Sequence, residues 1–203
     1  MGRLTDAVKH LIIINVIFYL VTFFVPNMHE KMMEWFALFY PTSEYFMPWQ
    51  FVTHMFMHGG FMHILFNMYG LWAFGSPLEQ LWGRNKFFFF YFSAGLGAAL
   101  IYTIANYFFE DYNAVAVGAS GAVYGVLVAF AMKFPNAKLA LIFFPVPIAA
   151  KYFIPLIVFG DLFFGFTSYS VGNIAHFAHI GGALVGFIIS LFWKNNQFKR
   201  WDK

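Results

Sequence analysis

The sequence predicts an all-α integral membrane protein with six transmembrane helices, from its composition, the length of its apolar segments and the placement of its basic residues. Of its 203 residues, 61% are hydrophobic and 10% are charged, whereas a soluble domain is about 45–50% apolar and about 25% charged. A soluble protein of this size could not cover so much apolar surface, so most of it must face lipid. We expect a single membrane domain over residues 1–203.

Six segments are apolar enough to cross a hydrocarbon core, which takes roughly 20 residues of helix. They cover residues 8–26, 51–74, 87–109, 115–132, 152–168 and 173–193. The fourth and fifth are short, and Gly118 and Gly121 near the start of the fourth predict that its helix begins below the membrane surface. Irregular backbone at that depth must be surrounded by protein or a water-filled cavity, which is a first sign of a site.

The basic residues indicate the orientation of the chain. If it crosses six times, every Lys and Arg except Lys31 falls on one side. Excess positive charge marks the cytoplasmic side, so both termini are predicted to be cytoplasmic. The first apolar run has no small-residue cleavage site after it and is expected to stay as a helix. With no long presequence before it, the expected location is a bacterial plasma (inner) membrane.

Composition also excludes several kinds of chemistry. The formal charge of +3 is too small to indicate a nucleic-acid partner. Because the chain has no cysteine, it can have no disulfides, no thiolate nucleophile and no thiolate metal ligands.

Polar residues gather in three of the predicted spans, and polar groups at membrane depth often mark function. Taken singly, each has an ordinary explanation: a serine between glycines permits close packing, and a histidine or asparagine can join two helices by a hydrogen bond. The residues are His54, His58, His63 and Asn67 in the second span, Ser120 and Tyr124 in the fourth, and His176 and His179 in the sixth.

Their combination favours nucleophilic catalysis. Ser120 and His179 lie at the outer ends of their spans, so their depth allows them to meet as nucleophile and general base. His63 and Asn67, four residues apart, share a helix face at a similar level. Their side chains could donate hydrogen bonds to the oxyanion that forms when a serine attacks an amide.

Small residues predict how the two helices approach. Gly182 and Gly186 fall in one stripe with His179, and Gly121 and Gly125 form a matching strip beside Ser120. Two such strips let backbones pack closely, as a hydrogen bond between serine and histidine on different helices requires.

A metal site is the competing hypothesis for an enzyme. His54 and His58 have the spacing of an H-E-x-x-H zinc helix, but the glutamate between them is missing, and Asp161 would have to supply a further ligand. We therefore predict no metal and no other cofactor.

At these residues the sequence closely resembles the rhomboid intramembrane serine proteases. The GxSG motif of that family appears at residues 118–121, and its AHxxGxxxG motif at residues 178–186. Its HxxxxHxxxN pattern appears as His58, His63 and Asn67. The three motifs lie on three predicted helices in the order of the family, and the resemblance extends over nearly the whole chain.

The resemblance implies a rhomboid-like bundle of six helices and a role for each matching residue. Ser120 and His179 would form a dyad without a catalytic carboxylate, and His63, Asn67 and the Ser120 backbone N–H would hold the oxyanion beside Gly118. Tyr124 would stack on the His179 ring, and His58 would help to hydrogen-bond the polar interior.

Three further positions are compared with the family. Asp161 matches an acidic position that the family does not use catalytically, and Glu79 matches one that ties loops together. Trp49-Gln50 stands where the family usually has a Trp-Arg pair, which leaves the anchoring of the first outward loop open.

The function expected from these residues is that of an intramembrane serine endopeptidase acting on transmembrane protein substrates in lipid. The resemblance implies that substrates enter between the second and fifth spans, beneath a cap at residues 166–175. Two alternatives are a non-proteolytic relative that binds membrane clients and a transporter, although no repeated halves are visible.

Overall fold

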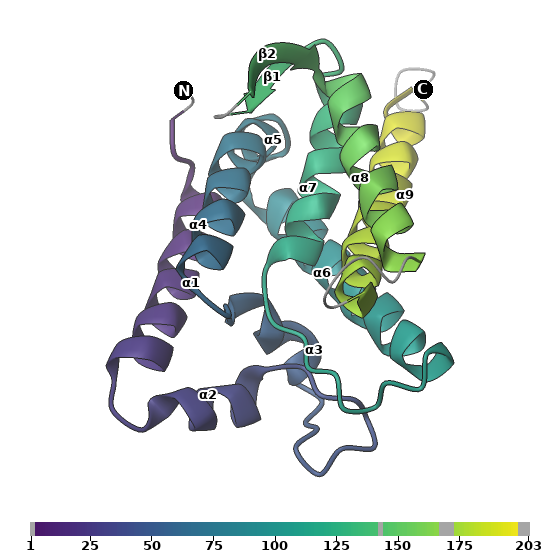
Figure 1. Cartoon of the computed structure of the whole chain (residues 1–203). Coiled ribbons are helices and arrows are strands. Elements are labelled where there is room, and N and C mark those ends of the chain that lie inside the picture. The colour runs from purple at the N-terminus through teal and green to yellow at the C-terminus, as the bar shows by residue number, and fades with distance from the viewer. Residues whose placement is uncertain (1–2, 142–143, 167–172, 199–203) are drawn as a thin grey trace.

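The computed structural model describes residues 3–141, 144–166 and 173–198, and this part of the chain is mostly helical (Figure 1). Long helices run roughly alongside one another between two ends of the molecule. They are α1 (Asp6–Phe24), α4 (Phe61–Gly70), α6 (Arg84–Phe108), α7 (Ser120–Lys133), α8 (Ala150–Phe166) and α9 (Asn173–Phe198).

Three helices of the described chain are long and apolar enough to cross a membrane: α1, α6 and residues 175–196 of α9. Helix α7 is apolar but has only 14 residues. The side chains agree with contact to lipid, since Ile17 and Leu20 of α1 and Phe192 of α9 are about half exposed or more. The description as a helical membrane protein therefore holds.

The second predicted span, residues 51–74, is wrong in its first half. The chain there forms only the short helices α3 (Gln50–Thr53) and η1 (His54–Phe56) and then leaves the helical conformation until Phe61. Two adjacent glycines, Gly59 and Gly60, interrupt the apolar run and disfavour helix. From Phe61 the helix continues without a break through a π-helical turn, η2 (Leu71–Gly75), and α5 (Ser76–Trp82).

The segment between α7 and α8 is a second correction. It forms an antiparallel hairpin of β1 (Lys138–Leu141) and β2 (Phe144–Ala149), with Lys138 opposite Ala149 and Leu139 opposite Ile148. An all-α description therefore fails at residues 138–141 and 144–149. Pro145 and Pro147 oppose helix here, and a hairpin with two free edges tolerates prolines that a central strand could not.

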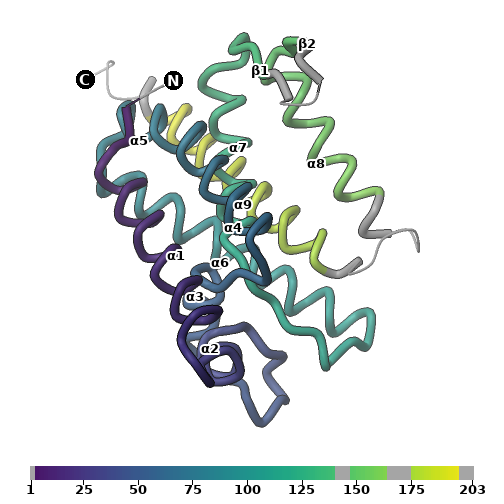
Figure 2. Tube along the Cα trace, turned by 60° about the vertical axis from the view of Figure 1, so that its left-hand side comes forward, coloured from purple at the N-terminus to yellow at the C-terminus, as the bar shows by residue number. Residues whose placement is uncertain are grey.

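The core includes one face of α6, which packs against α1, α3, α5, α7 and α9. Phe87, Phe90 and Tyr91 of α6 are fully buried with Leu71 of η2 and Leu78 of α5. Towards the other end of α6, the buried residues become small, with Ala94, Gly97 and Ala98. The small residues allow α7 and α9 to approach α6 and each other closely, as the central crossing in Figure 2 shows.

The bundle has two distinct ends (Figure 1). At the first, which we call the terminal end, α1 begins, α9 ends, and the hairpin and α5 lie. At the second, the loop end, lie α2 (Met28–Phe36), α3 and the connection at residues 109–119. The described Lys and Arg residues belong to elements of the terminal end, except for Lys31 on α2.

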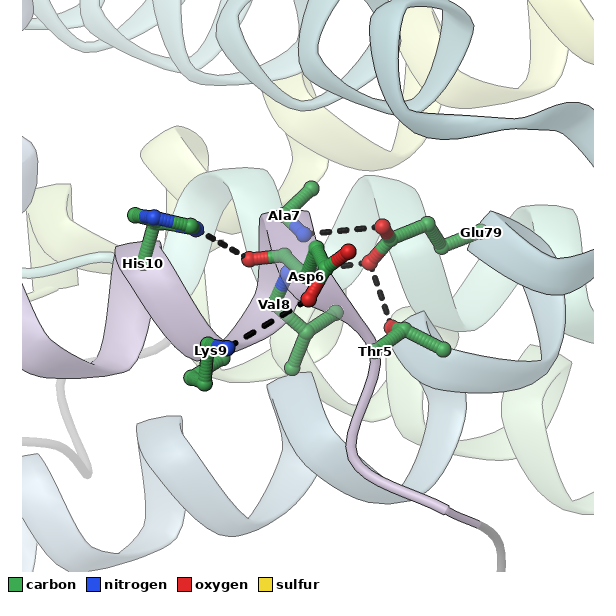
Figure 3. A network of polar contacts seen from close by, with 7 residues as sticks. All are labelled: Thr5, Asp6, Ala7, Val8, Lys9, His10 and Glu79. Atoms are coloured by element: carbon green, nitrogen blue, oxygen red, sulfur yellow. Dashed lines mark hydrogen bonds and ion pairs between the residues drawn. The ribbon is translucent and has the colours of Figure 1, made fainter.

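Glu79 of α5 fastens the first helix at the terminal end (Figure 3). Its buried carboxylate accepts hydrogen bonds from the Thr5 hydroxyl and from the backbone N–H groups of Ala7 (2.8 Å) and Val8 (3.0 Å). These N–H groups have no partner within the first turn of α1, and the positive end of a helix attracts a carboxylate. Glu79 therefore caps a helix, where the resemblance implied a tie between loops.

Candidate active site

Ser120 is the first residue of α7, and the backbone before it makes a turn that requires glycine. Gly118 has φ +124°, and its N–H donates to the His54 carbonyl at 2.9 Å. A Cβ at Gly118 would lie 2.7 Å from Nε2 of His63. The helix thus begins five residues after the predicted start of the fourth span, and the half-buried serine stands at its N-terminus.

Ser120 and His179 lie within hydrogen-bond distance. Nε2 of His179 is 2.8 Å from Oγ of Ser120. The Tyr124 ring stacks on the His179 ring with a centroid distance of 4.3 Å and an interplanar angle of 8°. This stacking fixes the plane of the imidazole.

The glycines of α7 and α9 face each other with almost no space between the two backbones. A Cβ at Gly182 would collide with the carbonyl group of Gly121. One at Gly186 would lie 2.6 Å from Cα of Gly125. Since backbone atoms cannot swing aside as a side chain can, these contacts set the separation of the helices that carry Ser120 and His179.

A cavity of ≈ 310 Å³ opens beside the pair. It lies between η1, the start of α4, α6, the extended residues 115–118 and the starts of α7 and α9. Its polar walls come from His54, His63, Tyr102, Ser120 and His179. Backbone N–H groups in the first turn of α7 have no partner within their helix, so the N-terminus of α7 offers hydrogen-bond donors where Ser120 stands.

His63 and Asn67 differ in their relation to this cavity. His63 lines it, and its Nδ1 is 3.4 Å from the Gly59 N–H. Asn67 lies one helical turn further along α4, is not among the lining residues, and donates its amide to the His63 carbonyl at 2.9 Å. His63 therefore reaches the cavity, while Asn67 uses one N–H of its amide within its own helix, and its role as an oxyanion donor stays a prediction.

His58 is buried beside His63, and its part in hydrogen-bonding the polar interior stays a prediction. It is 2% exposed and lies within hydrogen-bonding reach of the Phe56 backbone. Its ring meets the His63 ring edge-on at a centroid distance of 5.0 Å.

The zinc-helix alternative loses its geometric basis. The helix ends at Phe56, between His54 and His58, so the two side chains do not share a helix face. Nδ1 of His54 also lies 2.8 Å from the Gln50 carbonyl.

Asp161 contacts both His176 and His179, an arrangement that the sequence reasoning missed. Oδ1 of Asp161 lies 2.5 Å from Nδ1 of His176 and 3.4 Å from Nδ1 of His179. These three side chains are also the group in the described chain whose ligand atoms, all within 4.8 Å of one another, could hold a metal ion. The three-residue spacing of His176 and His179 on one helix was the available signal.

Gln50, which stands where the rhomboid resemblance led us to expect an arginine, anchors the first loop. Its side chain is fully buried and its amide bonds only to backbone. Nε2 donates to the carbonyls of Glu34 (2.9 Å) and Tyr45 (2.8 Å), while Oε1 accepts from the N–H groups of Phe39 (3.3 Å) and Met47 (3.2 Å). A neutral amide therefore holds the loop from both directions. The cap expected at residues 166–175 lies largely outside the described residues.

The chain is similar to several known proteins. A family model described as the Rhomboid domain matches residues 45–195. The chain is similar to the presenilin-associated rhomboid-like protein of Rattus norvegicus mitochondria, with 30% identity over 85% of this chain and 46% of that protein. It is also similar to two proteins of Bacillus subtilis. The first is the rhomboid protease GluP, with 33% identity over 68% of this chain and 25% of that protein. The second is the putative rhomboid protease YdcA, with 30% identity over 75% of this chain and 71% of that protein. The chain spans about half the length of the mitochondrial relatives that it matches.

Proposed function

Because this chain belongs to the rhomboid family, we propose that it is an intramembrane serine endopeptidase that uses Ser120 and His179. The observation that carries the proposal is the 2.8 Å distance between the serine oxygen and the imidazole nitrogen beside an open cavity. A serine is a weak nucleophile until an adjacent base can accept its proton.

The reaction follows from this arrangement. As Oγ of Ser120 attacks the carbonyl carbon of a peptide bond, its proton passes to Nε2 of His179. The carbonyl oxygen then carries the negative charge and faces the N-terminus of α7 and the His63 side chain. His179 gives the proton to the departing amine, which leaves an acyl-enzyme ester on Ser120. A water molecule, activated by the same imidazole, hydrolyses the ester and restores the serine.

We propose that the chain crosses the membrane six times with both termini in the cytoplasm. The supporting observations are that α1 begins and α9 ends at the same end, and that the elements of this end carry the basic residues. The loop end and the mouth of the cavity then face away from the cytoplasm. For the membrane itself, we propose the bacterial plasma membrane.

The proposed substrates are transmembrane proteins, cut in or near their membrane-spanning segment. A substrate helix must unwind locally, since a helix engages its carbonyls in its own hydrogen bonds. Nucleic acid and metal have no part in this proposal. The second candidate, a non-proteolytic protein that binds membrane clients, draws support from relatives named rhomboid-like rather than protease.

Hydrolysis by the purified protein separates these functions. In detergent or liposomes, the wild-type chain should cleave a transmembrane peptide, and Ser120→Ala should bind it without cutting. Phenanthroline should leave the rate unchanged. Cleavage by pure Ser120→Ala would end the serine mechanism, and binding without cleavage by the wild type would establish the client-binding function.

A further inference from the structure

The carboxylate of Asp161 lies behind the imidazole of His179, on the side away from Ser120. The distance from Oδ1 of Asp161 to Nδ1 of His179 is 3.4 Å, and Nε2 of the same ring is 2.8 Å from the serine oxygen. The two contacts therefore involve opposite nitrogens of one ring. We propose that Asp161 is a positioning residue that fixes the orientation and tautomer of His179; this inference rests on the proposed function.

The carboxylate decides which nitrogen carries the proton. An ionised carboxylate can only accept hydrogen bonds, so each histidine nitrogen that faces it must donate an N–H. In a neutral ring, a proton on Nδ1 of His179 leaves Nε2 without one. Nε2 can then accept the proton of Ser120, which is the form of the base that serine activation needs.

The buried carboxylate of Asp161 also requires hydrogen-bond donors, which the Nδ1–H groups of the histidines can supply. The Asp161 side chain is 11% exposed, and the Tyr124 hydroxyl also donates a hydrogen bond towards its carboxylate. A buried carboxylate without donors is costly. The contacts of Oδ1 with His176 and His179 supply donors, so Asp161 favours the Nδ1–H form of both rings.

The stacking of Tyr124 removes the other freedom of the base. With the ring plane held at 8° to that of Tyr124, His179 keeps two freedoms. The ring can flip about its Cβ–Cγ bond, which exchanges its two edges, and its proton can sit on either nitrogen. A contact at Nδ1 fixes both. Tyr124, Asp161 and Ser120 thus hold three different sides of the same imidazole, from α7 and α8.

A structural role for Asp161 is the rival explanation. His176 has the shorter contact, at 2.5 Å, and could use Asp161 only to fasten α8 to α9, which pack together at the edge of the bundle (Figure 2). If so, removing either partner of that contact should have the same effect. Positioning of His179 requires Asp161 and does not require His176.

Three variants test the inference on the 203-residue chain in micelles. They are Asp161→Asn, His176→Phe and, as a folding control, Leu162→Asn on the same helix. In a soluble serine protease, the corresponding Asp→Asn change lowers kcat about 10⁴-fold. Because the contact here is long and the dyad stays, we expect Asp161→Asn to lower kcat about 10–100-fold with KM nearly unchanged. The kcat of His176→Phe should stay within about threefold of the wild-type kcat.

The decisive readout is the tautomer of His179, which needs no substrate. Nitrogen NMR of 15N-histidine protein, assigned with His179→Gln, should show Nδ1–H in the wild type and in His176→Phe. In Asp161→Asn the proton should move towards Nε2, because the amide can donate to Nδ1. An unchanged tautomer in Asp161→Asn, or equal losses of kcat in Asp161→Asn and His176→Phe, would overturn the inference. An inactive wild type with the Nδ1–H tautomer would instead contradict the proposed function alone.

Discussion

The two ends of the bundle bury polar side chains in different surroundings. At the terminal end, Glu79 caps α1, and α4 runs through η2 into α5 as one continuous helix. At the loop end the backbone leaves the helical conformation at residues 57–60 and again at 109–119, and Gln50 holds four backbone groups of the first loop. The cavity, Ser120 and His63 all lie where helices are interrupted.

The difference teaches where function and stability reside in this chain. In the middle turns of a continuous helix, every backbone N–H already donates to a carbonyl of the same helix. The continuous helices of the terminal end therefore offer a substrate no N–H donors from these turns. Where a helix begins inside the bundle, as α7 does at Ser120, unpaired donors meet a cavity. Substitutions near the loop end should therefore change catalysis, and those at the terminal end should change stability.

The largest expected effect is at the glycine contact of α7 and α9. Valine at Gly182 would collide with the Gly121 carbonyl and push the helices apart. Since a misplacement of about 1 Å can cost about 10²-fold in rate, we expect labelling by a fluorophosphonate serine probe to fall at least about 100-fold. The small probe reports activation of Ser120 without any need for substrate entry.

Gly160→Val on α8 is the matched control, because a Cβ there meets no atom within 4 Å. Gly70 would not serve, since its Cβ would lie 3.1 Å from Val123 of α7. Folded Gly182→Val with wild-type labelling would show that backbone contact does not set the distance between serine and histidine.

The next effect separates the two predicted oxyanion donors. His63→Ala removes a polar group from the cavity wall and should lower kcat about 10–100-fold, less than the about 10²–10³ lost with one donor of a soluble protease, because the N-terminus of α7 remains. Asn67→Ala should change kcat less, since Asn67 lies outside the cavity lining. Steady-state kinetics of both variants checks this order, and a larger loss in Asn67→Ala would reverse the assignment.

Gln50→Ala should destabilise the first loop. The change leaves part-buried backbone donors and acceptors of four residues without their partner, and we expect a loss of about 1–3 kcal/mol in the free energy of unfolding. Equilibrium unfolding in mixed micelles measures it. The control is Gln80→Ala on α5, an exposed glutamine, which should leave stability unchanged; equal stability of the two variants would remove the anchoring role of Gln50.

Glu79→Gln should have the smallest effect and should leave kcat unchanged. The amide keeps an acceptor for the first turn of α1 but loses the charge that the helix end attracts, so we expect a loss of about 1 kcal/mol. Unfolding and kinetics on the same preparation test both parts, with exposed Glu30→Gln as control. A fall in kcat with stability intact would break the division between the two ends.

Much of this arrangement could be predicted because it rests on local pattern. Apolar length located α1, α6 and α9, and the spacing of Gly182 and Gly186 anticipated the strip that faces α7. Hydropathy could not show that residues 57–60 leave the helix, because Met57 and Phe61 continue the apolar run. The hairpin was missed for a similar reason, since its prolines oppose a helix without specifying a strand.

The contacts of Asp161 and Gln50 depended on tertiary structure. Asp161 is 15 residues from His176 along the chain, and only the packing of α8 on α9 brings them together. Gln50 bonds to residues as far away as Glu34, through the path of a loop that has no periodic pattern. Where a side chain acts through distant backbone, its neighbours in the sequence give little indication of its partners.

The most direct test of the account is to locate the adduct that a fluorophosphonate forms on the folded protein. Peptide mapping by mass spectrometry should find it on Ser120 in the wild type, and His179→Ala, which lacks the base, should react far more slowly. Ser120→Ala should carry no adduct at all. Labelling at another residue, or undiminished labelling of Ser120→Ala, would contradict the claim that Ser120 is the nucleophile.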